Sequence, residues 1–194
     1  MVSGQIVIYD LDGTITRLDS LYFFILFLLK KRELKLKKIL PALFRHFLIH
    51  KDPLRLKISL LQSLKEKRRY ALEDLGRGFA LSLNKIFFRK KLFDLIKIQK
   101  REGAKLILLT SALDIYANPI GERLGFYKVL STKVGFKNSI INGCIEGVEI
   151  RNLYKVLALK KLAKEENIDL ARAVGYGNQD DEGWLNLLVQ KIIY

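Results

Sequence analysis

The chain has 194 residues, of which 49% are hydrophobic and 28% are charged, and its formal net charge is +15. This length and apolar content allow one substantial core together with a small second module. The single cysteine, Cys144, excludes an internal disulfide. The N-terminus has neither the basic start nor the apolar core of a signal peptide. We therefore expect an intracellular, cytoplasmic protein with one main domain and an insert.

The positive charge is concentrated in one segment. Residues 30–102 contain 22 lysines and arginines but only seven aspartates and glutamates, whereas basic and acidic residues balance in the rest of the chain. The excess charge should therefore be explained by the partner or the solvation of that segment.

The first predicted element is a short strand that ends in two carboxylates. The apolar run Ile6-Val7-Ile8-Tyr9 is followed by Asp10-Leu11-Asp12-Gly13-Thr14-Ile15. The carboxyl ends of strands in open α/β sheets are where ligands bind. Carboxylates at this spacing can divide a two-step displacement, with Asp10 as the nucleophile and Asp12 as the acid/base. The alternative is an Asx-Gly turn that only closes the strand.

A helical insert is predicted for residues 19–82. Nine consecutive apolar residues, 21–29, precede basic, leucine-rich stretches at 31–50 and 54–71, in which apolar positions recur at three- and four-residue steps. Pro41 and Pro53 are expected at helix starts or breaks, and Gly76 with Gly78 at another break.

The apolar run 21–29 has two interpretations. As a helix it would extend about 14 Å, which is too short to span a bilayer. It is either buried inside a helix bundle or in contact with an anionic membrane surface, where neighbouring lysines would meet the headgroups.

An alternating pattern of helices and strands follows the insert. The expected elements are a helix at 90–101, a strand at 105–109, a helix at 115–124, a hairpin within 127–150, a helix at 154–166, a strand at 171–176 and, in 184–194, a helix with a short closing strand. Asn142-Gly143 is the expected hairpin turn. The pattern predicts an α/β fold, with a Rossmann-like, mostly parallel sheet covered by helices and the helical insert after the first strand.

Three further groups of residues carry chemistry in this pattern. Thr110 and Ser111 follow a strand, where a hydroxyl and free backbone N–H groups could hold a phosphoryl oxygen, although such residues also cap helices. Lys155 opens a helix, where a basic residue suits the helix dipole poorly; an exposed surface lysine is the alternative. The segment 175–182 follows the last predicted strand and is rich in oxygen ligands of the kind that Mg²⁺ prefers, with an acidic helix start as the alternative.

In this order, the four segments resemble the haloacid dehalogenase (HAD) superfamily of phosphohydrolases, in particular the subgroup that includes phosphoserine phosphatase. The resemblance implies a phosphatase that works through an aspartyl-phosphate. It matches Asp10 and Asp12 to the nucleophile and the acid/base of the first motif. It matches Thr110, with Ser111 beside it, to the phosphate-binding hydroxyl of the second motif, and Lys155 to the lysine of the third. The segment 19–82 matches the cap of this subgroup, and residues 1–18 and 83–194 match the catalytic core.

The fourth motif departs from the family pattern. The family has an aspartate after the glycine, whereas this chain has Asn178; Asp181 then matches the second acid after a one-residue deletion. A different register puts Tyr176 at the first position, and we prefer Asn178 because it keeps an oxygen ligand. The resemblance implies a Mg²⁺ cofactor held by Asp10, Asp12, Asn178 and Asp181. An amide in place of a carboxylate should weaken metal binding.

The resemblance also implies a phosphorylated small-molecule substrate. Phosphoserine phosphatases select their substrate with a glutamate and a cap arginine, and the matching positions here hold Asp19 and Lys57. Because lysine lacks the bidentate fork of arginine, phosphoserine is not favoured, and a lipid-type phosphate is the other substrate class. The alternative function is a catalytically weakened relative whose basic cap binds an anionic membrane surface or nucleic acid. Nucleic acid is the less favoured partner, because the segment has no aromatic-basic recognition motif.

Overall fold

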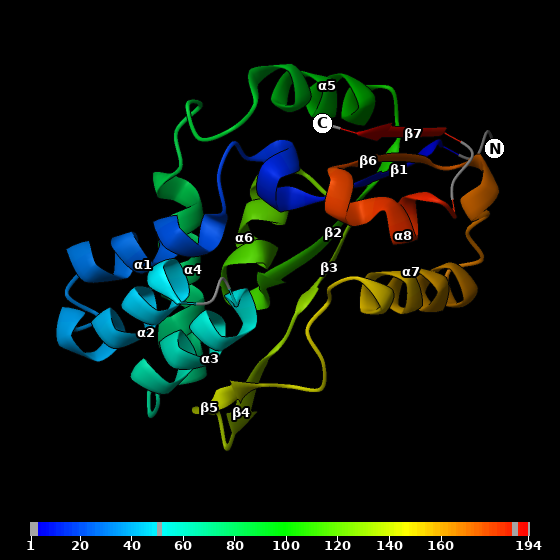
Figure 1. The fold of residues 1–194 in the computed structure, drawn as a ribbon. Helices are drawn as coiled ribbons and strands as arrows, with labels where there is room; N and C mark the ends of the chain where they lie inside the picture. Colours follow the sequence, from blue (N-terminus) through cyan, green and yellow to red (C-terminus); the bar gives the residue numbers. More distant parts are fainter. Residues whose placement is uncertain (1–3, 50–51, 188–189, 194) are drawn as a thin grey trace.

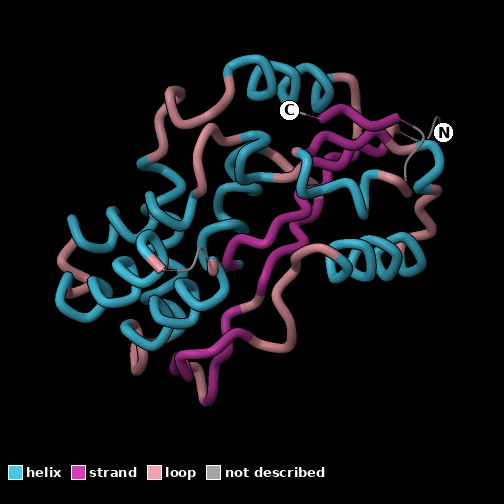
Figure 2. Tube along the Cα trace, in the orientation of Figure 1, coloured by secondary structure: helices cyan, strands magenta, loops and turns pink. Residues whose placement is uncertain are grey.

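The computed structural model describes residues 4–49, 52–187 and 190–193. In this part of the chain a five-stranded sheet forms the centre of the fold, with strand order β3-β2-β1-β6-β7 and every neighbouring pair parallel. Figures 1 and 2 show helices on both sides of this sheet. The predicted α/β fold with a mostly parallel, Rossmann-like sheet is confirmed. The strands are β1 (Ile6–Tyr9), β2 (Lys105–Leu113), β3 (Lys128–Thr132), β6 (Val174–Gly177) and β7 (Gln190–Ile193).

The central strand β1 is buried on both faces. Because side chains alternate along a strand, Val7 and Tyr9 belong to one apolar cluster and Ile8 to another. A run of consecutive buried apolar residues is what a parallel sheet covered on both faces requires. The strand order reverses at β1, between β2 and β6, and ligands bind at such a reversal in open α/β sheets. The first face is covered by α5 (Lys90–Arg101) and α6 (Asp114–Leu124), the second by α7 (Leu153–Glu165) and α8 (Glu182–Leu185).

Four helices lie between β1 and α5, at one end of the molecule (Figure 1). The chain turns between them at 31–35 and 64–68, where longer helical stretches were expected. Pro53 starts a helix as predicted, with the Asp52 side chain accepting a hydrogen bond from the Arg55 N–H. The predicted break at Pro41 is wrong: Pro41 lies inside α2, which packs through the buried side chains of Ile39 and His46. The helices are α1 (Ser20–Lys30), α2 (Leu36–Leu48), α3 (Pro53–Ser63) and α4 (Arg69–Ser82).

Helix α4 runs through Gly76 and Gly78, so the break predicted there is also wrong. Gly76 meets a different need, because a Cβ at this position would lie 1.6 Å from the backbone oxygen of Ile115 in α6. Two helices that approach so closely need a residue without a side chain. Gly76 therefore marks the contact between α4 and α6.

The apolar run 21–29 lies in α1, and one face of this helix is buried. Leu21, Phe24, Ile25 and Leu28 are inaccessible to solvent, whereas Leu26 is 60% exposed. The ring of Phe24 packs against that of Tyr116 in α6, with centroids 4.7 Å apart. Burial in a helix bundle is therefore the interpretation that accounts for this run. No helix in the described ranges combines the length and the apolar content needed to cross a membrane.

The segment after α6 differs from the prediction. Residues 128–132 join the main sheet, so the hairpin is shorter than expected and contains only β4 (Val134–Lys137) and β5 (Ile140–Ile145). Its turn is Asn138-Ser139, with φ of 51° and 60°, the positive values that a two-residue hairpin turn requires. The predicted turn at Asn142-Gly143 is wrong. Gly143 lies inside β5, where Gln62 of α3 donates a hydrogen bond to its carbonyl oxygen.

Strand β2 extends four residues beyond its predicted end. Its pairing with β3 shifts register between Leu109 and Leu113, so Thr110 and Ser111 lie in an irregular part of the strand, not in a following loop. The closing strand expected within 184–194 is present as β7, whereas the helix expected there is only the four-residue α8, which begins two residues earlier, at Glu182, and ends at Leu185. Residues 50 and 194, the predicted ends of two elements, lie outside the described residues.

The two connections between the sheet and helices α1–α4 run side by side. Thr16 and Phe88 form an antiparallel bridge. On either side of it, the Arg17 N–H donates to the Phe87 oxygen at 3.2 Å, and the Arg89 N–H donates to the Ile15 oxygen at 2.8 Å. The chain therefore leaves and re-enters the sheet region at adjacent points, which holds α1–α4 beside the carboxyl ends of the strands.

Candidate active site

Asp10 and Asp12 lie directly after β1. The Asp10 N–H donates to the Tyr176 oxygen of β6 at 2.9 Å, which continues the sheet pairing to the first carboxylate. The chain then bends through Leu11–Ile15, where Gly13 has a φ of 77°. Glycine adopts this left-handed conformation without a Cβ penalty. The bend places both carboxylates at the lining of one cavity of about 400 Å³.

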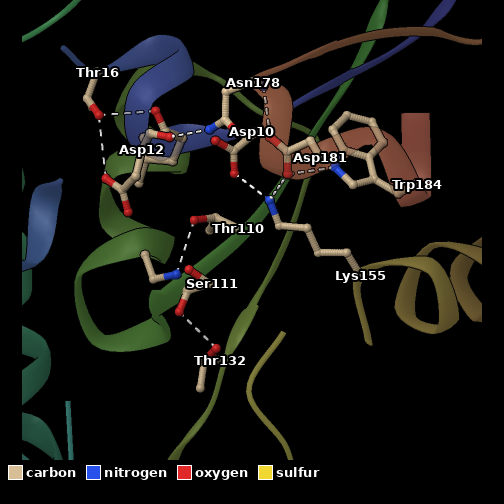
Figure 3. Close-up of polar contacts among 12 residues, drawn as sticks. Asp10, Asp12, Thr16, Thr110, Ser111, Thr132, Lys155, Asn178, Asp181 and Trp184 are labelled. Atoms are coloured by element: carbon tan, nitrogen blue, oxygen red, sulfur yellow. Dashed lines mark hydrogen bonds and ion pairs between the residues drawn. The ribbon is translucent and has the colours of Figure 1, made fainter. Parts of the chain in front are cut away.

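Lys155 connects two of the predicted site residues. It lies in the first turn of α7, and its ammonium contacts Asp10 Oδ1 at 2.6 Å and Asp181 Oδ1 at 2.5 Å (Figure 3). All three side chains are nearly inaccessible to solvent. Burial works against the charge of Lys155, but the two carboxylates outweigh this effect and raise its pKa. Residues 10, 155 and 181, far apart in sequence, thus form one buried ionic group.

Asp181 is held by its own segment as well. Its Oδ2 accepts the backbone N–H of Asn178 at 3.0 Å, and its Oδ1 accepts the indole N–H of Trp184 at 2.9 Å. The Asn178 side chain reaches back to the first motif, where its Nδ2 donates to the Asp12 backbone oxygen at 3.0 Å (Figure 3). The segment after β6 is therefore tied to the segment after β1.

Asp12 is half-buried and has no cation beside it among its described partners. Its Oδ1 accepts the Ser20 N–H at 2.7 Å and the Thr16 hydroxyl at 3.4 Å. Burial, followed by the nearby charges of Asp19 and Asp10, raises the pKa of Asp12 to about 7. Asp12 can therefore exchange a proton near neutral pH, which is what an acid/base group needs.

Asp10 carries a different charge balance. Burial raises the pKa of Asp10 to about 6, and the adjacent Lys155 limits the rise. Asp10 Oδ1 is bound to Lys155, whereas Oδ2 is buried and has no hydrogen-bond partner among the described residues. A buried carboxylate oxygen without a hydrogen bond is uncommon, and it is the arrangement expected of a group that binds a cation or reacts with a substrate.

Ser111 and Thr110 differ in their access to the cavity. Ser111 lines it, whereas Thr110 is fully buried beneath, with its hydroxyl oxygen accepting the Ala112 N–H at 3.1 Å. The Ser111 backbone oxygen is held in place by the Thr132 hydroxyl at 2.9 Å. The predicted phosphate-binding pair is thus close to the two carboxylates, with Ser111 at the surface of the cavity.

The two predicted selectivity residues line the same cavity. Asp19 caps α1, with its Oδ1 accepting the Leu21 N–H at 2.8 Å. Lys57 of α3 is buried, and its ammonium contacts Glu149 Oε1 at 2.5 Å and the Ser111 backbone oxygen at 2.6 Å. Glu149 was not anticipated from the sequence, because it lies in no motif and is 92 residues from its partner. Its contact ties α3 to the sheet region.

The cavity brings together the residues of all four predicted motifs. Arg17, Leu18 and Arg151 also line it and were not anticipated; none belongs to a recognisable pattern. The cavity is lined by Asp10, Asp12, Gly13, Arg17, Leu18, Asp19, Pro53, Lys57, Ser111, Arg151, Asn152, Lys155, Asn178 and Asp181.

Comparison with known families assigns this fold and site to a class. Residues 7–180 match the family model of haloacid dehalogenase-like hydrolases. Because this match covers most of the chain, the protein belongs to that family. This is the superfamily that the four motifs predicted.

Individual relatives agree with this assignment. The chain is 28% identical over 131 residues to phosphoserine phosphatase from Methanocaldococcus jannaschii, a match that covers 67% of this chain and 62% of the relative. The chain is thus aligned with less than two thirds of that relative's length. A protein of unknown function from Bordetella pertussis Tohama I has the same fold, with a TM-score of 0.78, 18% identity and coverage of 99% and 90% of the two chains. The structure of a phosphoserine phosphatase in its apo form is similar with a TM-score of 0.62 and 20% identity, and the match covers 97% of this chain and 85% of that one.

The donor set after β1 and β6 is compatible with Mg²⁺, which the family implies. Mg²⁺ is bound through carboxylate and carbonyl oxygens, and the site offers Asp10 Oδ2, unpartnered among the described groups, the Asp181 carboxylate and the Asp12 carbonyl. Asn178 supplies an amide in place of a further carboxylate. In the described part of the chain, no three His, Cys, Asp or Glu side chains are grouped to hold a metal. The metal-ligand set therefore stays a prediction.

Proposed function

We propose that this protein is a phosphomonoester hydrolase that works through an aspartyl-phosphate on Asp10. The observation that carries this proposal is the buried group of Lys155, Asp10 and Asp181 at the cavity, with one Asp10 oxygen unpartnered among the described groups. A lysine ammonium beside a nucleophilic carboxylate offsets the repulsion between that carboxylate and a phosphate dianion, which is about 4 kcal/mol per charge pair at 4 Å and an effective dielectric of 20.

The reaction has two steps in this arrangement. One carboxylate oxygen of Asp10 forms a bond to phosphorus while the bond from phosphorus to the substrate oxygen breaks, and Asp12 gives its proton to the departing alkoxide. Asp12, now a carboxylate, takes a proton from water, whose oxygen attacks phosphorus and releases Asp10 and inorganic phosphate. A pKa of about 7 for Asp12 supports both roles near neutral pH.

We assign the binding of the substrate's phosphate oxygens to Lys155 and Ser111. Thr110 would hold this part of β2 in place through its hydrogen bond with the Ala112 N–H. The candidate Mg²⁺ ligands are Asp10, Asp12 through its backbone oxygen, Asn178 and Asp181. When bound, Mg²⁺ would neutralise charge on the phosphate and on Asp10. These assignments rest on the position of each residue at the cavity and on the family resemblance.

Residues 19–82 are proposed as the cap, and residues 1–18 and 83–194 as the core. The helices α1–α4 occupy the former range and contribute Pro53 and Lys57 to the cavity. We propose that Asp19 and Lys57 select the substrate, with Lys57 acting as part of its pair with Glu149. The substrate is a phosphorylated small molecule, with lipid-type phosphates included. Membrane binding by residues 21–29 is left out of this proposal, because one face of that helix, with Leu21, Phe24, Ile25 and Leu28, is buried in the helix bundle.

The experiment measures phosphate release from an aryl phosphate and from a panel of metabolite phosphates, with and without Mg²⁺. Wild type should turn over at least one substrate in the presence of the metal, and Asp10→Asn should lose this activity by a factor of about 10³ or more. Asp94→Asn, an exposed aspartate on α5, is the matched control and should behave as wild type. Turnover that survives Asp10→Asn would contradict the assignment of the nucleophile. A wild type inactive at any Mg²⁺ concentration would contradict the proposed function.

A further inference from the structure

A second hollow lies beside the active site. It is an open, largely apolar groove of about 930 Å³ between α1 on one side and α4 with the following segment 83–87 on the other. Figure 1 shows α1 and α4 at the end of the molecule that contains the helical insert. The groove follows α1 along its length, which is about 16 Å for an 11-residue helix. It is long enough for an extended acyl or prenyl chain.

The walls of the groove are unusually apolar for an exposed surface. Leu26 of α1, Leu81 of α4 and Ile86 are 60%, 74% and 79% exposed, and all three line it. Gly78 lines it from α4, where a Cβ would first meet the ring of Phe27 at 3.5 Å. Contiguous exposed apolar side chains of this kind mark a binding surface.

The groove and the active-site cavity share two residues. Arg17 and Leu18 line both hollows, so the two meet at the segment that enters α1. Leu18 is 60% exposed there, an apolar side chain at the margin of a cavity otherwise lined mainly by polar groups. A substrate whose phosphate lies at Asp10 can reach the groove across this margin. Continuity with the active site therefore favours the substrate itself as the occupant of the groove.

The pairing of Lys57 argues against an amino acid substrate. Its ammonium is already bound to Glu149 and to the Ser111 backbone oxygen. A substrate carboxylate would have to displace a buried ion pair to use this lysine, whereas an apolar group needs no such exchange. The Lys57–Glu149 pair thus presents no free ammonium to a substrate carboxylate, and the adjacent apolar surface is open.

We propose that the substrate is a phosphomonoester with a long apolar tail, and that the tail binds in the groove between α1 and α4. The proposal rests on the proposed function, since the phosphate is placed at Asp10. Lys30 and Lys31 also line the groove, at the opposite end of α1 from Arg17 and Leu18, and the aliphatic stem of a lysine can pack along apolar surface.

The test compares n-alkyl phosphates from ethyl to octyl, used below their micelle concentrations. In wild type, kcat/KM should rise by at least about tenfold over the six added methylenes, because each methylene that the open groove buries, even in part, adds apolar contact. A double variant, Leu81→Gln with Ile86→Gln, should reduce the octyl-to-ethyl ratio by about threefold. Both residues are exposed, so these changes should leave the melting temperature unchanged. Leu40→Gln on α2, 52% exposed and outside the groove, is the matched control and should keep the wild-type ratio.

A binding measurement separates this proposal from the proposed function. Alkyl phosphonates have no cleavable P–O–C bond, and their affinity can be measured by calorimetry without turnover. Affinity that rises with chain length in wild type and less in the double variant supports the groove even if no substrate is hydrolysed. Chain-length dependence that is absent, or equal in the double variant, overturns it while leaving phosphatase activity intact. A groove that binds a second copy of the chain would give this result together with a concentration-dependent mass.

Two natural sources share the proposed chemistry, the monophosphate of an acylglycerol and that of a prenyl alcohol. The last experiment compares kcat/KM for a 1-acylglycerol 3-phosphate and a prenyl monophosphate of similar length, with glycerol 3-phosphate as the reference without a tail. A higher kcat/KM for either tailed substrate supports the proposal and names the source. Equal values for all three overturn it.

Discussion

The charge balance of the site depends on one residue, Lys155. Its ammonium lies within 2.6 Å of two buried carboxylates, so the group of three carries a net charge of about −1 before any ligand binds. Removal of the ammonium would leave two buried like charges facing each other. The remaining negative charge would be neutralised by a further cation. This is the physical reason to expect a metal at Asp10 and Asp181.

Asn178 is the residue that should limit metal binding. Its amide nitrogen donates to the Asp12 backbone oxygen, so it competes with a cation for that oxygen. Asn178→Asp replaces this donor with a negatively charged ligand and should lower the Mg²⁺ concentration for half-maximal activity by about tenfold. Asn118→Asp, an exposed change of the same type on α6, is the control. A Mg²⁺ titration with the same midpoint in wild type and Asn178→Asp would contradict the assignment.

Asp12 should make the metal-free protein less stable at high pH. Its pKa is about 7 when folded and about 4 when unfolded, so between these values the folded state holds a proton that the unfolded state has lost. The free energy of unfolding therefore falls as pH rises through this window. Asp12→Asn should be near neutral at pH 4 and stabilising by about 1–3 kcal/mol at pH 8.

Chemical denaturation in a chelator at several pH values measures this effect. Asp10, with a pKa of about 6, contributes a similar trend that Asp12→Asn leaves in place, so the slope should be reduced and not abolished. Asp94→Asn should follow the wild-type profile. Parallel profiles for wild type and Asp12→Asn would show that burial of Asp12 has no energetic consequence.

The sequence predicted site residues that share a local pattern and missed those that do not. Asp10 and Asp12 stand in a motif behind a strand, and Lys155 stands out at a helix start. Glu149 was missed because its role exists only through Lys57, with which no local spacing connects it. Arg17 was missed for a related reason: its position between two hollows follows from the packing of α1 against α4.

At the scale of elements, α4 is the helix that joins the insert to the sheet region. The approach of Gly76 to the Ile115 oxygen brings α4 against α6. Sequence patterns treat a glycine in a helix as a break because its conformational freedom is local, whereas the close contact that requires Gly76 is tertiary. The hairpin turn was misplaced for a similar reason. Asn142-Gly143 is the stronger turn pattern, but pairing between β4 and β5 puts Asn138-Ser139 at the turn.

Gly76 and Gly78 offer a matched pair of substitutions in one helix. Gly76→Ala should destabilise the protein by about 1–3 kcal/mol or more, because its methyl group would overlap backbone of α6. Gly78→Ala should stabilise by about 0.5–1 kcal/mol, because its Cβ has ordinary contacts and alanine favours a helix. Urea denaturation of both variants gives the two values. Equal effects of the two substitutions would mean that α4 and α6 are not in close contact.

At the scale of the whole molecule, the proposed cap and the proposed core share one apolar cluster. It extends from β1 through α6 into α1 and α4, where the rings of Phe24, Phe79 and Tyr116 pack on one another with centroids 4.7–5.8 Å apart. The boundaries at residues 19 and 82 therefore separate two parts of the sequence, but the hydrophobic core continues across them. The sequence could not show this, because contacts between insert and core leave no periodic pattern.

A shared core predicts that cap and core unfold together. Calorimetry should show a single transition with equal calorimetric and van't Hoff enthalpies. Phe24→Ala should destabilise that single transition by about 3–5 kcal/mol, since it opens a cavity at the junction. Phe44→Ala on α2, where the side chain is 59% exposed, is the control and should have a small effect. Two resolved transitions, in wild type or in Phe24→Ala, would contradict a common core.

Cys144 is exposed on β5, beside Gln62 of α3. Because it is the only cysteine in the chain, a maleimide fluorophore would react at this position alone, in the wild-type sequence. The dye would lie at the contact between the β4–β5 hairpin and helix α3, and its emission would report changes in that contact during turnover. The lone thiol thus makes the protein suited to stopped-flow and single-molecule spectroscopy without prior mutagenesis.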